Sequence, residues 1–315
     1  MRLSRTLLTA FAATLTLAAT AQAFPERPVN YIIPFNPGGE SDISARLQQP
    51  FFEKITGHEA VIQYQPGAGG SQAWSTLNTL PADGHTIMGT NLPHIVMQPM
   101  LQDPGYETDD LVNVYMFHYT PDALIVRAES AFQNVQDVID AAMEAPGAIT
   151  VSGSGTNSAN DVANKVFENE TGAVLTYIPY SGTSPSVAAL LGGEVEAQWG
   201  YSTVAAAQGD QVRMLAVAME NRHPLFPDVP TFRELGIDMV GGAYRGIAVP
   251  SGVDEETRQA LSDIIGQINA DPEFIEAMEG AGFAMLDVSY DEMADWMAAR
   301  KDTYRGIADQ LAAGR

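Results

Sequence analysis

The stretch that decides the fold is YIIPFNPGGESD, residues 31–42. Apolar residues run from Tyr31 to Phe35, as in a buried strand. The chain then turns through Asn36-Pro37-Gly38-Gly39 and restarts with polar residues that suit the first turn of a helix. A strand that ends in two glycines before a helix leaves backbone N–H groups free to point at something small and negative. The other loops must indicate whether this is a phosphate, a carboxylate or only water.

The first 23 residues differ in kind from the rest. Arg2 and Arg5 precede the apolar run LLTAFAATLTLAAT, and Ala21-Gln22-Ala23 follows it. This pattern predicts a secretory signal peptide cleaved after Ala23. The apolar run is too short to span a membrane comfortably and no later segment approaches one, so we expect no direct membrane insertion. Without a cysteine after the cleavage site there is no bacterial lipid anchor, and we expect an exported, periplasmic protein.

The amino-acid composition of the chain limits the classes of ligand and partner that it can bind. The 315 residues, 45% of them hydrophobic, suffice for two domains of ordinary size. No cysteine is present, which excludes disulfides and thiolate metal sites. The net charge is −23, and loss of Arg2 and Arg5 leaves 14 basic against 39 acidic side chains, or −25. Such a balance argues against nucleic acid, whose binding depends on Lys and Arg contacts to phosphate.

Strand-like and helical patterns alternate along most of the chain, which predicts an α/β fold with parallel sheets covered on both faces. One helical pattern ends at Gly57 and another at Gly172, both predicted C-caps. The last 60 residues read as helices only, with a cap at Asp271-Pro272 and a capping box at 289–292. The predicted strands are Tyr31–Phe35, Ala60–Tyr64, Thr86–Gly89, Ala123–Val126, Ile149–Ser152, Leu175–Pro179, Val195–Trp199, Met214–Ala218 and Gly246–Val249.

Nine strands are many for a single sheet, which favours two α/β domains. The chain is expected to leave the first domain near Thr120-Pro121-Asp122 and to return within residues 236–246. The first domain is then discontinuous, 24–121 plus 240–315, and the second, 122–239, is inserted into it. Ligands of open α/β sheets bind where the strands end and the helices begin, so the loops between them are the candidate site.

Four of five such loops combine glycine with hydroxyl groups ahead of a helix. Any one of them can be an ordinary turn with an ordinary cap, but four at equivalent edges predict an anion-binding cleft. No phosphate-binding fingerprint is present, and Glu40 and Asp42 beside the first loop suit a polyphosphate badly, so a carboxylate is favoured. Asp42 is instead expected to fix N–H groups of its own loop. The loops are 36–42, 65–72, 90–94 (which lacks glycine), 152–161 and 180–186.

No catalytic arrangement is visible. The motif G-x-S-x-G is absent around Ser154, and the five histidines lack a metal-binding spacing, so no cofactor or metal is expected. His94 alone lies in a candidate ligand loop. Arg245 is the natural partner of a carboxylate, although a salt bridge to one of many acids explains it equally well. Tyr180 and Tyr201 lie at strand ends, where they can wall a pocket.

The chain resembles the periplasmic solute-binding proteins of tripartite tricarboxylate transporters, the Bug or TctC-like family. The resemblance implies a two-domain Venus-flytrap fold of the type II periplasmic binding kind, capture of a small carboxylate between the domains, and delivery to membrane permease subunits. It implies that loop 35–42 and the Gly-Thr loop 154–158 clasp one carboxylate. The segments that carry it are 27–57, 61–90, 152–172, 177–199, 212–237 and RGIAVPSGV at 245–253.

This chain departs from the family pattern at three places. The common Gly-Thr-Pro-Ser-His reads GTNSA at 155–159, Gln65 replaces the Arg of RPGAGG, and Tyr244-Arg245 stands where a tryptophan is common. Arg-Gly at 245–246 is similar to the branch associated with tricarboxylates, which suggests a second anionic group.

The hypothesis is therefore a periplasmic receptor for a di-, tri- or aromatic carboxylate that closes on its ligand and is not an enzyme. A receptor that feeds a sensor kinase, or a secreted α/β hydrolase, is the alternative. The expected ligand-binding residues are Phe35, Pro37, Gly38, Gly39, Ser41, Asp42, Asn91, Ser154, Gly155, Thr156, Asn157, Tyr180, Tyr201 and Arg245.

Overall fold

The structure, a computed structural model, describes residues 24–313, so the predicted signal peptide lies outside the described residues. Its strands are β1 Val29–Ile33, β2 Ala60–Tyr64, β3 Thr86–Leu92, β4 Val112–Arg127, β5 Thr150–Gly153, β6 Thr176–Pro179, β7 Ala197–Tyr201, β8 Val212–Val217, β9 Gly242–Val249 and β10 Ala284–Val288. Its α-helices are α1 Glu40–Thr56, α2 Ser71–Trp74, α3 His94–Leu101, α4 Val135–Glu144, α5 Ala159–Thr171, α6 Thr183–Leu191, α7 Ser202–Gln208, α8 Glu255–Asn269, α9 Pro272–Gly280 and α10 Tyr290–Ala313.

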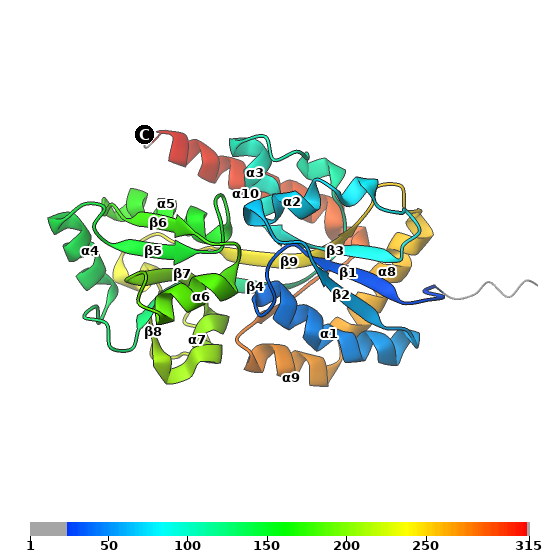
Figure 1. Ribbon diagram of the computed structural model, residues 1–315, viewed down its shortest axis with the longest axis horizontal. Coiled ribbons are helices and arrows are strands. Elements are labelled where there is room, and N and C mark those ends of the chain that lie inside the picture. The colour runs from blue at the N-terminus through cyan, green and yellow to red at the C-terminus, as the bar shows by residue number, and fades with distance from the viewer. Residues whose placement is uncertain (1–23, 314–315) are drawn as a thin grey trace, which may run out of the picture.

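The strands form one mixed sheet in the order β2-β1-β3-β9-β4-β7-β5-β6, with β8 and β10 also paired to β4. β1 is parallel to β2 and β3, and β5 is parallel to β6 and β7, whereas every pair that involves β4 or β9 is antiparallel. Figure 1 shows the two long strands β4 and β9 running between two lobes that lie side by side. The fold is thus α/β, as predicted, but its sheet is mixed rather than purely parallel.

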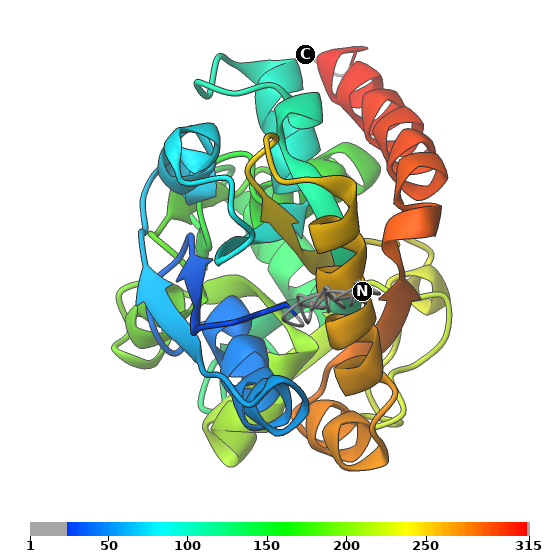
Figure 2. The ribbon, with the colours of Figure 1, turned by 90° about the vertical axis from the view of Figure 1, so that its right-hand side faces the viewer.

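Each lobe has its own hydrophobic core. One core draws its buried side chains from residues 29–117 and 247–304, with Val162 from α5, and defines the first lobe. Two further clusters, drawn from residues 123–239, define the second lobe. Figure 2 shows α8, α9 and α10 on one side of the first lobe, where the C-terminal segment returns to it.

The structure corrects two expectations about the strands. The predicted strand Ala123–Val126 is only the end of a longer one, because β4 runs from Val112 through Thr120-Pro121-Asp122 to Arg127 as a single 16-residue strand. Pro121 is tolerated because it lies where the partner of β4 changes, since Pro121 pairs with Gly242 and Asp122 with Tyr201. The last 60 residues are not helices only, because the short strand Ala284–Val288 pairs with β4.

The helix ends follow the sequence closely. α1 and α5 each end at a glycine in the left-handed conformation, Gly57 with φ +74° and Gly172 with φ +76°. Asp271 caps α9 ahead of Pro272. At 289–292 half of the predicted capping box forms: the Ser289 N–H donates to the Glu292 carboxylate, but the Ser289 hydroxyl also donates to that carboxylate and does not accept from the Glu292 N–H.

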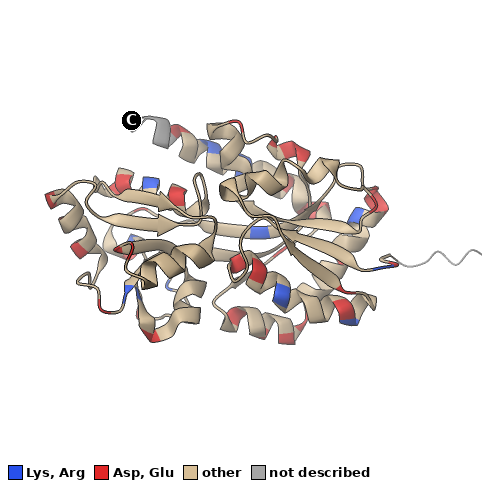
Figure 3. Ribbon diagram, in the orientation of Figure 1, with Lys and Arg blue, Asp and Glu red and all other residues tan. Residues whose placement is uncertain are grey.

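Acidic residues are spread over the outer helices and loops of both lobes, among fewer basic residues (Figure 3). Within residues 24–313, no helix combines the length and the apolar character that a membrane span requires. The same part of the chain holds no group of three or more His, Cys, Asp or Glu side chains able to hold a metal ion.

Candidate ligand-binding site

The candidate site is a small cavity between the two lobes at the hinge. Its volume is ≈ 10 Å³, about the space of one water molecule, so the lobes are closed on one another in this conformation. Both lobes and the hinge strand β9 contribute to it. Its lining residues are Phe35, Gly39, Glu40, Ser41, Asn91, His94, Ser154, Thr183, Tyr201 and Arg245.

Three helices begin at this cavity. Their first residues, Glu40 of α1, His94 of α3 and Thr183 of α6, all line it. None of the three receives a side-chain cap, because the residues before them are Gly39, Pro93 and Gly182. Uncapped first turns present N–H donors and the positive end of the helix dipole, and both stabilise an anion. By contrast, α5 is capped by its own Ser158 hydroxyl, which accepts from the Asp161 N–H.

The loop between β1 and α1 is held open by Asp42. The Gly38 N–H donates to Asp42 Oδ2 at 2.6 Å, and Gly38 has φ +77°. The same carboxylate accepts from the Tyr64 hydroxyl at 2.7 Å and from Arg46 Nε at 2.8 Å. Asp42 therefore fixes the loop, as expected, and its charge is matched by Arg46 rather than directed into the cavity.

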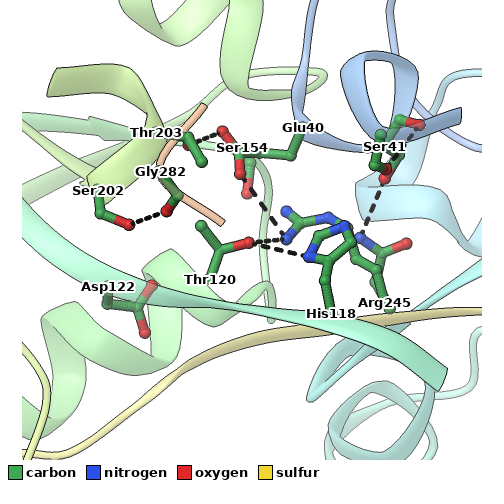
Figure 4. A network of polar contacts seen from close by, with 12 residues as sticks. Glu40, Ser41, His118, Thr120, Asp122, Ser154, Ser202, Thr203, Arg245 and Gly282 are labelled. Carbon is green, nitrogen blue, oxygen red and sulfur yellow. Dashed lines mark hydrogen bonds and ion pairs between the residues drawn. The ribbon is translucent and has the colours of Figure 1, made fainter. Parts of the chain in front are cut away.

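Arg245 lies at the centre of the site, on β9, and is 4% exposed. Its Nη1 donates to Thr120 Oγ1 at 2.8 Å, and its guanidinium carbon lies 5.0 Å from the centroid of the Tyr201 ring. The Asn91 amide separates Arg245 from Ser41, and when it is turned so that its oxygen faces the guanidinium, it accepts from Arg245 Nε at 3.2 Å. Contacts from three strands therefore fix the cation, and Figure 4 shows the one from Thr120.

Glu40 is the acid that faces Arg245, and Figure 4 shows the two side chains directed toward each other. Glu40 Oε2 lies 3.9 Å from Arg245 Nη1. Glu40 Oε1 accepts a hydrogen bond from the Thr203 hydroxyl of the second lobe, but Oε2 is buried without a hydrogen-bond partner. Burial raises the pKa of Glu40, while the charge of Arg245 and the Thr203 hydrogen bond oppose this shift.

The other titratable groups beside Arg245 are neutral near pH 7. Burial, helped by the charge of Arg245, lowers the pKa of His94 to about 3 and that of His118 well below its usual range. Burial raises the pKa of Asp122 to about 8, against opposing contributions from Asn160 and Arg245. The charge of the site is consequently set by Arg245 and by the protonation state of Glu40, whose pKa burial raises.

A chain of hydrogen bonds positions Ser154 at the end of β5. The Ser154 N–H and hydroxyl both donate to Asn160 Oδ1, at 3.0 and 2.6 Å, and Asn160 Nδ2 donates to Asp122 Oδ1 at 3.1 Å. Asp122 belongs to the hinge strand β4. The second-lobe loop is therefore anchored to β4.

Direct contacts join the two lobes around the cavity. Asn36 Nδ2 donates to Ser181 Oγ at 2.6 Å, and the Ser202 hydroxyl donates to the Gly282 carbonyl at 2.9 Å. A Cβ on Gly155 would lie 2.9 Å from the Gly69 Cα, so the two glycine loops meet backbone to backbone. Glycine is required at this contact because any side chain would hold the lobes apart.

The structure brings together seven of the fourteen expected residues and places the other seven around them. Phe35, Gly39, Ser41, Asn91, Ser154, Tyr201 and Arg245 line the cavity. The remaining residues form loop backbone, loop supports or outer surface, and they are Pro37, Gly38, Asp42, Gly155, Thr156, Asn157 and Tyr180.

Two of these seven bind their own lobe through their side chains. The Asn157 amide oxygen accepts from Lys165, beside the start of α5, and the Tyr180 hydroxyl donates to Glu194.

Sequence reasoning missed Glu40, Thr183 and Thr203. Glu40 was taken as a poor neighbour for phosphate, although its place as first residue of α1 already put it beside the loop. Thr183 follows Gly182 in a loop that the sequence singled out, so its place at the helix start was within reach. Thr203 carries no local pattern, and only the closure of the lobes brings it to Glu40.

A larger hollow, ≈ 250 Å³, lies between α5 and α10. Its lining is mostly apolar, with Asp122, Tyr244 and Arg300 among the polar side chains. The helix that begins at this hollow, α5, is capped by its own side chain. Pro93, which precedes α3, reaches this hollow, but none of the first residues of α1, α3 and α6 lines it, in contrast to the smaller cavity.

Comparison with known proteins agrees with this geometry. The family model described as "Tripartite tricarboxylate transporter family receptor", TctC, matches residues 44–312. Protein BugT of Bordetella pertussis (strain Tohama I) is 27% identical over 311 residues, which cover 96% of this chain and 95% of BugT.

Two solved structures are similar in fold. "R. palustris Rpa4515 with adipate" has 24% identity and a TM-score of 0.86, and the match covers 92% of this chain and 98% of that one. MatC from Rhodopseudomonas palustris with bound malate has 23% identity and a TM-score of 0.84, over 90% and 99% of the two chains. The expected two-domain periplasmic-binding fold is confirmed, and the chain belongs to the TctC family of tripartite tricarboxylate transporter receptors.

Proposed function

We propose that this protein is a periplasmic solute-binding receptor that captures a small organic carboxylate in the cleft between its lobes. The observation that carries this proposal is the meeting of three uncapped helix N-termini, those of α1, α3 and α6, at one buried cavity with Arg245. A carboxylate placed there is met by backbone N–H donors and by the hydroxyls of Ser41 and Thr183. Rpa4515 and MatC, which share the fold, were solved with adipate and malate.

Binding is coupled to closure of the lobes. We propose domain boundaries of 24–121 plus 240–315 and 122–239, so that α1 and α3 belong to one domain and α6 to the other. A carboxylate touches both sets of N–H groups only when the domains are closed, and it therefore favours the closed state. A cavity of ≈ 10 Å³ admits no ligand of several heavy atoms, so the domains must first separate for entry.

The receptor would act outside the cytoplasm and hand its ligand to permease subunits. We propose export because the sequence predicts a signal peptide cleaved after Ala23. We propose permease partners because the chain belongs to a family of transporter receptors. Nothing in the cavity resembles an activated nucleophile, and the role is binding rather than catalysis.

A thermal-shift screen of the purified protein tests the proposal. Mono-, di-, tri- and aromatic carboxylates are added to the wild type, to Arg245→Ala and to Arg305→Ala, a control on the exposed face of α10. A ligand at about 100 times its Kd adds about 2.7 kcal/mol, which raises the Tm by roughly 2–4 °C for a chain of this size. The proposal expects such a rise for the wild type and the control and a smaller one for Arg245→Ala. It is wrong if no carboxylate changes the Tm of folded wild-type protein.

A further inference from the structure

The further inference concerns the second group of the ligand and rests on the proposed function. We propose that Glu40 is the receptor for an ammonium group, so that the ligand is an amino acid or a similar ammonium carboxylate rather than a plain mono- or dicarboxylate. The observation behind it is a carboxylate side chain built into a pocket whose helix N-termini already serve an anion.

The first argument is the unmatched oxygen of Glu40. This side chain is 4% exposed, and its Oε2 is buried without a hydrogen-bond partner. Arg245 does not supply the missing donor, because its Nη1 lies 3.9 Å away and donates to Thr120 instead. A buried carboxylate oxygen without a donor is unfavourable, and a donor on the ligand removes this penalty.

The second argument is the position of Glu40 relative to the lobes. Glu40 opens α1 in the first lobe, and Arg245 lies on β9, which pairs with β3 of that lobe. The hydrogen bond from Thr203 comes from the second lobe and is lost when the lobes separate. In the open cleft Glu40 therefore faces incoming ligand with Arg245 beside it, and the pair presents one acceptor and one donor.

The third argument is the charge of the site. Beside Glu40 and Arg245, the titratable groups that face the site are His94 on α3, His118 and Asp122 on β4, and Tyr201 on β7, and burial favours the neutral form of each. Burial raises the pKa of Glu40 too, and the charge of Arg245 opposes this rise. An ammonium group beside Oε2 opposes it as well, and Glu40 ionised in this way sums to zero with Arg245.

A ligand that is neutral overall but carries both charges leaves this balance intact. A dicarboxylate brings two negative charges and sets one of them against Glu40, where like charges repel.

Isothermal titration at pH 7 with matched pairs tests the inference. Each pair differs in the ammonium group alone: L-alanine and propionate, L-aspartate and succinate, L-glutamate and glutarate, L-phenylalanine and 3-phenylpropionate. Every pair is titrated into the wild type, Glu40→Gln and Glu53→Gln, the last a control on the exposed face of the same helix. Thermal unfolding without ligand shows that each variant is folded.

We expect at least one pair in which the wild type and Glu53→Gln bind the ammonium member ten times or more tightly than its partner. Glu40→Gln should reduce this preference at least tenfold, because it keeps the shape of the side chain and removes its charge. The inference is overturned if the wild type binds the member without ammonium as tightly, or if Glu40→Gln keeps the preference. Those results leave carboxylate binding intact. Failure of all eight compounds to bind overturns the inference alone, and the thermal-shift screen, which includes tri- and aromatic carboxylates, decides the proposed function separately.

Discussion

Glu40 Oε2 and Arg245 Nη1 lie 3.9 Å apart inside the closed cleft, and both side chains are 4% exposed. Each belongs to an element that reaches the cavity from the first lobe or the hinge, so their proximity does not depend on closure. The pair sets an acid beside a cation inside the site, and the charge of Arg245 opposes the rise that burial causes in the pKa of Glu40. The stability of the protein and the ligand selectivity of the site therefore depend on the same two side chains.

Removal of the cation alone should destabilise the protein more than removal of both charges. Arg245→Gln leaves Glu40 buried without its partner, which typically costs 3–5 kcal/mol, about the range we expect at pH 8. Glu40 can escape part of this cost by taking up a proton, so the loss should be smaller at pH 5. The double variant Glu40→Gln with Arg245→Gln should recover most of the stability. Urea unfolding at both pH values measures this, and an equal loss in the single and double variants would contradict it.

The contact between Gly155 and Gly69 should limit closure. A methyl group on Gly155 lies 2.9 Å from the Gly69 Cα, so Gly155→Ala should hold the lobes apart and weaken carboxylate binding about tenfold or more. Gly172→Ala is the matched control, because Gly172 also has positive φ but has no atom within 4 Å of the added Cβ. The control should lose about 1 kcal/mol of stability and keep its affinity. Calorimetric titration of a carboxylate into both variants measures this difference. Equal carboxylate affinities of Gly155→Ala and Gly172→Ala would refute the role of this contact.

Asp42 should matter for binding through the loop that it holds. Asp42→Ala removes the acceptor of the Gly38 N–H and the partner of Tyr64 and Arg46, so we expect a loss of about 2 kcal/mol in stability and a several-fold loss of affinity. Asp137 accepts from the Gln133 N–H at 2.6 Å in the same way at the start of α4, away from the cavity. Asp137→Ala should cost stability alone. An affinity loss of equal size in both variants would show that the effect is general.

Asp122 should make stability depend on pH. Its pKa is raised by burial from 3.8 to about 8, so between pH 4 and pH 8 the folded chain keeps a proton that the unfolded chain has lost. The contribution is complete below pH 4, and stability falls as the pH rises toward 8, by up to about 1.4 kcal/mol per pH unit from this group. Asp122→Asn, which keeps the oxygen that accepts from Asn160, should flatten this slope. Unfolding free energies across this range test it, and an unchanged slope in the variant would exclude Asp122 as the cause.

Local signals in the sequence predicted most of the elements but little of the geometry between lobes. Helix ends at Gly57 and Gly172 were predicted correctly because a left-handed cap is determined by the residue at that position. Strand Ala284–Val288 was missed because it is short, lies at an edge and is flanked by strong helix signals. The continuity of β4 through Pro121 was missed because proline normally ends a strand, and only the change of partner at that residue permits it.

The residues of the site were likewise predicted where the signal is local and missed where it depends on contacts between the lobes. Loops 36–42 and 152–161 were selected from glycine and hydroxyl patterns, because such patterns are local. The pairing of Glu40 with Thr203 joins residues 163 positions apart and depends on closure, so no local pattern contains it. Asn157 was expected at the ligand because it follows Gly155 and Thr156, but its φ of +53° and its bond to Lys165 place its side chain on the lobe itself.

The most direct measurement is a crystal structure of the protein grown with a carboxylate that raises its Tm. The account predicts carboxylate density between the first turns of α1 and α6, within about 3 Å of backbone N–H donors, with Arg245 beside the ligand. Density in the hollow between α5 and α10, or at an outer surface, with the cavity at Arg245 unchanged, would contradict it.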